Sequence, residues 1–161
     1  MNSLQKLNET GLAKMNKPGN ITASDCVNSQ ALLTYKAEEK EQLYKLIEKN
    51  IAKIFYALGH DLEKNRIEIL TELLIESRKY ETPETILSFL HKCAKGELGK
   101  FYGKPGIDQL QEKFATFLES SIIPERERQK GKPEKYDNQR EQPQTIQEFG
   151  KNYIRFIAKA K

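Results

Sequence analysis

The sequence predicts an all-α fold, a compact bundle of about five helices, and three observations support this prediction. Apolar side chains recur at three- and four-residue steps through the middle of the chain, which places them on one stripe of each helix. Recognisable start and stop signals separate these stretches. Alternating runs of β-branched residues are missing, so a sheet would be at most a minor hairpin around Phe101-Tyr102.

The two longest predicted helices follow one another in the central part of the chain. The first covers residues 37–58, with glutamates and lysines opposite its apolar stripe, and Gly59 stands where a left-handed C-cap would sit. Asp61 is the predicted N-cap of the second helix, which runs to about Lys79. We expect the buried side of this second helix to consist of Leu62, Ile67, Leu70, Leu73, Leu74 and Ile75.

A third helix begins at Thr82-Pro83, because threonine caps a helix and proline is tolerated at its first position. This helix ends at Gly96. Residues 96–106 hold four glycines and a proline in eleven residues, which predicts a loop. Asp108 opens a further helix that runs to about Ser121. The predicted core of these helices includes Leu46, Ile54, Leu70, Leu74, Leu90 and Phe114.

The sequence divides into three parts. Residues 1–22 are predicted to form an N-terminal arm, and residues 23–123 the helical core domain, in which 23–35 is another helix. Residues 124–161 form a charged linker and a C-terminal amphipathic helix. Ten basic residues against six acidic ones in this last part equal the net charge of +4 of the whole chain, so the tail is basic. The apolar side of its helix carries Ile146, Phe149, Tyr153, Phe156 and Ile157.

Composition and charge argue against several classes of protein. No apolar run approaches the ~18–20 residues of a membrane span, and the N-terminus lacks the apolar stretch of a signal peptide. We therefore expect a cytoplasmic protein in which Cys26 and Cys93 are free thiols in or near the core. With 27 Lys+Arg against 23 Asp+Glu, the chain lacks the strong basic footprint of a dedicated double-stranded DNA binder.

No catalytic or metal-binding motif is recognisable, so we expect a protein that is not an enzyme and uses no cofactor. The run from Gly96 to Lys100 differs from a phosphate-binding P-loop, since two residues separate its glycines and Phe101 follows the lysine. His91 and Cys93 lie roughly 200° apart around a helix, too far to share a metal ion.

The loop is the candidate binding site. Its lysines lie close in sequence to two aromatic residues, and its glycines allow the backbone to approach a partner. Exposed amines beside an aromatic ring suit phosphate contact combined with base stacking. A structural interpretation stays open, in which Phe101 and Tyr102 simply pack into the core after a helix C-cap. The nucleic-acid-binding interpretation assigns the site to Lys95, Lys100, Tyr102 and Lys104.

The order of features between about residues 40 and 128 resembles a group of small uncharacterised helical proteins of phages and mobile elements of Bacteroides-type bacteria. The resemblance depends mainly on Lys-Gly-Glu-Leu-Gly-Lys-Phe-Tyr-Gly, residues 95–103, which follows Thr-Pro-Glu-Thr-Ile-Leu-Ser-Phe-Leu, residues 82–90. In that group the turn reads G-K-x-G-K-x-Y-G, whereas here Glu97-Leu98 stands between the glycines and Lys95 precedes the first. The resemblance implies a helical fold, a bacterial cytoplasmic setting and an accessory role in replication.

Two functional hypotheses follow. The first is a non-enzymatic, nucleic-acid-associated accessory protein of a mobile element, which binds DNA or RNA through the loop at residues 95–104 and the basic tail. The alternative is a protein–protein interaction adaptor, whose C-terminal amphipathic helix docks on a protein partner or on a second copy of the chain. Salt distinguishes the two, because phosphate-driven binding weakens steeply with salt and apolar docking does not.

Overall fold

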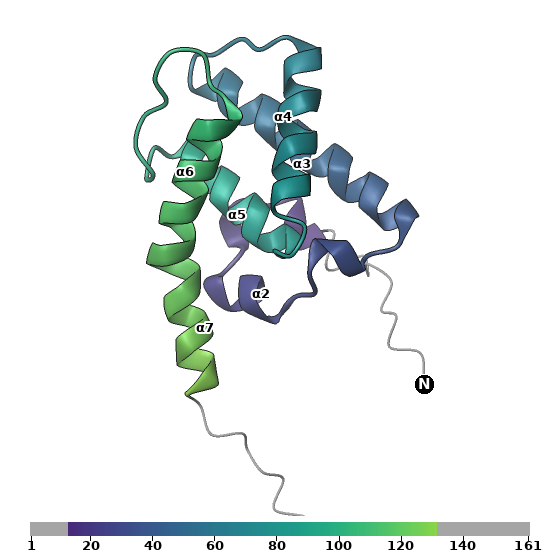
Figure 1. Cartoon of the computed structure of the whole chain (residues 1–161), viewed down its shortest axis with the longest axis vertical. Helices are drawn as coiled ribbons and strands as arrows, with labels where there is room; N and C mark the ends of the chain where they lie inside the picture. The colour runs from purple at the N-terminus through teal and green to yellow at the C-terminus, as the bar shows by residue number, and fades with distance from the viewer. Residues whose placement is uncertain (1–12, 132–161) are drawn as a thin grey trace, which may run out of the picture. The chain divides into compact units, whose positions relative to one another are not determined.

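The structure is a computed structural model and describes residues 13–131 of the chain. Within this range all regular structure is helical, in about six helices without a strand (Figure 1). The all-α prediction is therefore confirmed. The predicted C-terminal amphipathic helix and residues 1–12 of the predicted arm lie outside the described residues. None of the described helices combines the length and the apolar character needed to span a membrane.

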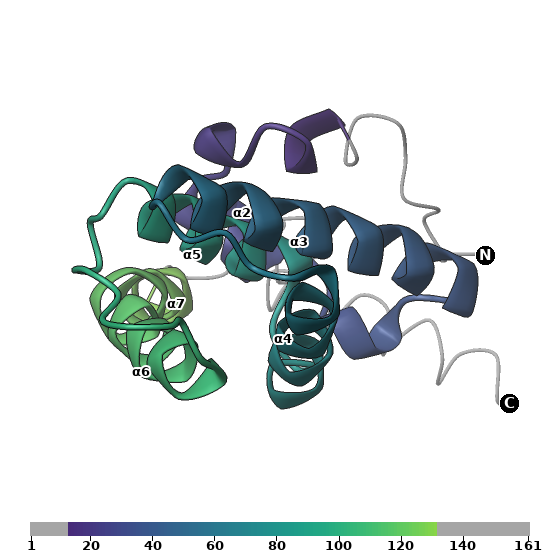
Figure 2. The ribbon, with the colours of Figure 1, turned by 90° about the horizontal axis from the view of Figure 1, so that it is seen from above.

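Helices α3 (Ala37–Ala57) and α4 (Lys64–Ser77) correspond to the two longest predicted helices. They cross each other rather than run side by side (Figure 2). Gly59 follows α3 with a φ of 81°, a left-handed conformation that glycine adopts without steric cost. The C-cap prediction at this position is thus confirmed.

The predicted N-cap of α4 at Asp61 is wrong, because the helix begins after Glu63. The residues between the helices are needed for the connection itself. The backbone N–H of His60 donates to the carbonyl oxygen of Phe55 at 2.8 Å, and Leu62 packs against the core. Both interactions keep residues 60–62 out of the helix, so α4 begins only at Lys64.

Helix α5 (Pro83–Ala94) is the most enclosed element of the described chain. Thr82 is its N-cap, and the Thr82 hydroxyl accepts a hydrogen bond from the backbone N–H of Thr85 at 3.1 Å. Helix α5 contacts α3 and α2 (Ala23–Asn28), and its buried residues are distributed around most of its circumference. The predicted cap and the predicted proline at the first position are both confirmed.

Helix α6 (Ile107–Phe117) continues through a π-helical segment (Leu118–Ile122) into α7 (Ile123–Lys130), and the three appear as one long rod in Figure 1. The expected end at about Ser121 is therefore wrong. The π segment ends two residues before Pro124, whose missing N–H cannot continue an α-helical ladder. An ion pair of 2.6 Å between Arg126 and Glu81 holds α7 near the end of α4.

The N-terminal part of the described chain contains shorter helical segments than predicted. The single helix expected over 23–35 is wrong: α2 ends at Asn28, and a separate 3-10 turn, η2 (Leu32–Thr34), follows. Met15 and Ile21 are buried in the core although both belong to the predicted arm. The core thus includes Met15 and Ile21, which precede the predicted 23–123 domain.

The core confirms part of the predicted set of buried residues and corrects the rest. Leu73 is 39% exposed, and four others are only partly buried: Leu46, Leu62, Ile67 and Ile75. Leu73 lies on the outer side of α4, since the inward side of that helix is occupied by Leu70, Thr71 and Leu74. The fully or almost fully buried residues of the prediction are Ile54, Leu70, Leu74, Leu90 and Phe114.

Candidate nucleic-acid interface

The predicted loop connects α5 to α6 at the end of the molecule where α3 turns into α4 (Figure 1). Gly96 and Gly99 have φ values of 73° and 82°, a region in which a residue with a Cβ is strained. These positions explain why the sequence needs glycine here. The loop prediction is confirmed.

Four interactions hold the loop against its neighbouring helices. The Phe101 ring packs edge-on against Phe55, with 5.2 Å between the ring centroids. The Lys113 ammonium lies 5.0 Å from the Phe101 ring centroid and donates to the Leu98 carbonyl oxygen at 2.7 Å. On the far side of the loop, the guanidinium of Arg66 donates to the Pro105 carbonyl oxygen at 2.9 Å. The loop is thus anchored to α3, α4 and α6.

Tyr102 has the opposite orientation from its neighbour and is 77% exposed. Its backbone is nevertheless held on both sides by one side chain. The Tyr102 N–H donates to Gln109 Oε1 at 3.0 Å, and Gln109 Nε2 donates to the Tyr102 carbonyl oxygen at 2.8 Å. The structural interpretation of the loop is therefore right for Phe101, which packs against the core, and wrong for Tyr102.

The loop lysines differ in their surroundings. Lys100 and Lys104 are exposed, and neither forms an ion pair with any residue that the structure describes. Lys95 lies 3.6 Å from a Glu97 carboxylate oxygen, which offsets part of its charge. Lys92 donates to Ser121 Oγ at 2.9 Å and lies over the Phe117 ring, so it serves the packing of α5 against the rod of α6.

Lys104 also faces a group of residues that sequence spacing did not connect with the loop. A hollow of about 340 Å³ lies between the loop and the turn that follows α3. It combines two cationic side chains with two carboxylates, so its formal charge is balanced. The lining residues are Gly59, His60, Asp61, Leu62, Glu63, Arg66, Lys104 and Pro105.

Comparison of the chain with protein-family models, with curated proteins and with solved structures gave no match. The resemblance to proteins of mobile elements therefore stays a prediction. The functional argument depends on the geometry of the chain itself.

The two cysteines among the described residues are both buried. Cys26 and Cys93 are free thiols in the core, as predicted, and burial raises their pKa values to about 11 and about 12. Such thiols are protonated at neutral pH and poorly nucleophilic. Residues 13–131 contain no group of three or more His, Cys, Asp or Glu placed to hold a metal ion.

Proposed function

We propose that the protein is a non-enzymatic, nucleic-acid-associated protein that binds DNA or RNA through the loop at residues 95–104. The exposure of Tyr102 carries this proposal, because the backbone of this residue is held by Gln109 on both sides. A fixed backbone lowers the entropy that an aromatic side chain loses on binding. A ring presented in this way suits stacking against a base, which requires no particular sequence.

The charges of the loop support the same proposal. Lys100 and Lys104 flank Tyr102 in the sequence and are exposed. Ammonium groups of this kind contact phosphates and carry no base information, so we expect binding without sequence preference. The carboxylates of Glu97, Asp61 and Glu63 near the loop reduce the local positive charge. We therefore expect weak binding that depends on low salt.

Fluorescence anisotropy with mixed-sequence single-stranded DNA and RNA, measured over a series of salt concentrations, tests the proposal. Replacing Lys100 and Lys104 together by Ala should lower the salt slope by about two, one for each lost phosphate contact. Tyr102→Ala should weaken binding by about 1–3 kcal/mol, the usual contribution of one stacked base.

The matched control replaces Lys49 and Lys53 by Ala. These two lysines are exposed on α3, outside residues 95–104, and removing them lowers the net charge by the same amount. If this control changes the salt slope as much as the loop variant does, or if the unmodified protein does not bind at low salt, the proposal is wrong. Association with a protein partner that is insensitive to salt would instead favour the adaptor, whose predicted helix lies outside the described residues.

A further inference from the structure

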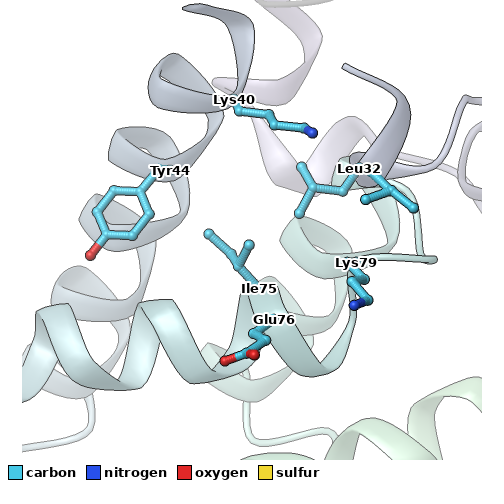
Figure 3. A pocket seen from close by; sticks show the side chains of 7 residues that line it. Leu32, Lys40, Tyr44, Ile75, Glu76 and Lys79 are labelled. Atoms are coloured by element: carbon cyan, nitrogen blue, oxygen red, sulfur yellow. The ribbon is translucent and has the colours of Figure 1, made fainter. Parts of the chain in front are cut away.

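A second surface feature lies away from the loop, where η2, the start of α3 and the end of α4 meet. It is a hollow of about 270 Å³ whose wall is mostly carbon. Figure 3 shows the side chains of Leu32 and Ile75 facing each other across it, with the Tyr44 ring at one side. The backbone N–H of Leu33 donates to the carbonyl oxygen of Lys79 at 2.8 Å, which fixes η2 beside the end of α4.

Two lysines stand at the rim of this hollow. Lys40 comes from α3 and Lys79 from the residues just after α4, so they approach from different sides (Figure 3). Neither forms an ion pair with a carboxylate of the described residues. Glu76 lines the hollow as well, so its apolar floor is edged by two lysines and one carboxylate, with a net positive charge.

The adjoining outer face of α4 has the complementary character. Ile69 and Leu73, one helical turn apart, are 55% and 39% exposed. Glu72 and Glu76, also one turn apart, are exposed beside them and form no ion pair within the described residues. We call these four residues the α4 ridge. It presents apolar side chains with negative charge at their edge.

A two-fold symmetric contact requires that one surface carry both complementary features, because the same patch of each copy meets the other. The α4 ridge and the lysine-rimmed hollow satisfy this requirement, since they lie on neighbouring sides of one helix and Glu76 belongs to both. Leu33 and Tyr80, at 47% and 73% exposure, add apolar surface at the same end of α4.

We propose that the protein associates with a second copy of itself through this face, with the α4 ridge of each copy seated on the hollow of the other. Glu72 and Glu76 of one copy then lie near Lys40 and Lys79 of the second. The exposed apolar surface is small, so we expect a weak dimer whose population rises with protein concentration. This inference does not depend on nucleic-acid binding or on the C-terminal helix.

Charge reversal on the full chain tests the proposal, with sedimentation velocity as the measurement. One variant carries Lys40→Glu and Lys79→Glu, so that both surfaces are negative. The other carries Glu72→Lys and Glu76→Lys, so that both are positive. Each variant alone should lose at least tenfold in dimer affinity, because like charges now face each other. An equimolar mixture of the two should restore a dimer, since each negative surface then meets a positive one.

A control variant with Lys49→Glu and Lys53→Glu changes the net charge as much as the first variant but alters only exposed positions elsewhere on α3. It should dimerise like the unmodified protein, and circular dichroism should show the same helix content in all variants. A monomeric unmodified protein at every concentration would overturn the proposal. So would a dimer that both reversals leave intact, or one that the mixture fails to restore.

Discussion

At the scale of single residues, burial decides how a side chain contributes to this protein. Glu84 shows this most clearly, because it is a carboxylic acid that is only 8% exposed. Its Oε2 atom has no hydrogen-bond partner, and burial raises the pKa of its side chain above the ordinary value of 4.5, although hydrogen bonds from its own backbone and from Ser29 oppose this shift. A buried, incompletely bonded carboxylate is unfavourable in its charged form.

Glu84→Gln should therefore stabilise the protein at neutral pH. A raised pKa in the folded state means that the acid favours folding below pH 4.5, and that this contribution is lost as pH rises through the folded-state pKa. Glutamine removes the charge and keeps the shape. Urea unfolding at several pH values should show the variant more stable at pH 7, with the difference shrinking as pH falls towards 4.5. A variant that is less stable at pH 7, or a difference that does not change with pH, would contradict this.

At the scale of elements, the start of α5 joins a local signal to a long-range contact. The Thr82 hydroxyl caps the helix and also donates to the carbonyl oxygen of Cys26 at 3.0 Å, so it ties α5 to α2. Thr85 reaches the same carbonyl only at 3.5 Å. One hydroxyl group thus supports both the start of a helix and the packing of two helices.

Thr82→Ala should lower the free energy of unfolding by about 1–2 kcal/mol, since it removes the cap and leaves a buried carbonyl poorly bonded. Thr82→Ser should retain most of the stability, because serine keeps the hydroxyl. Thr116→Ala is the matched control. The Thr116 hydroxyl donates to a carbonyl within its own exposed helix turn, so we expect a change within about 0.5 kcal/mol. Equal effects of the two alanine substitutions in urea unfolding would show that the cap contributes little.

At the scale of the whole molecule, the helices of the described chain share one core around α5. Phe89 on α5 contacts Phe114 on α6, with 4.7 Å between ring centroids, and Leu74 on α4 is fully buried. Close packing of this kind means that a truncation in one helix is felt as a loss of stability of the whole domain. A truncation on the exposed outer face of α4 does not cause such a loss of stability.

Leu74→Ala and Leu73→Ala form a matched pair that tests this assignment of faces. Leu74→Ala should cost about 2–5 kcal/mol because it leaves a cavity in the core. Leu73→Ala should cost no more than about 0.5 kcal/mol, since it lies on the surface. Both values come from urea unfolding of dilute protein, so that association between copies does not contribute. If Leu73 proves the more costly of the two, α4 is rotated relative to this structure.

The sequence alone determined the helical class, both ends of α3 and α5, and the position of the loop. These features depend on local chemistry: the left-handed glycines at Gly59 and Gly96, the Thr82-Pro83 start, and apolar stripes at helical spacing. It also indicated the loop lysines, whose exposure at Lys100 and Lys104 is confirmed. Their role in binding stays a prediction.

Only the tertiary structure decided which neighbours in sequence point to opposite sides. Phe101 packs on Phe55 while Tyr102 faces solvent, and Leu74 is buried while Leu73 is exposed. The approach of Arg66 to the loop and the continuation of α6 into α7 were likewise not predicted. Each of these depends on contacts between residues far apart in the chain. Such contacts leave no signal in local spacing, because the position of a distant helix determines which side of a segment is covered.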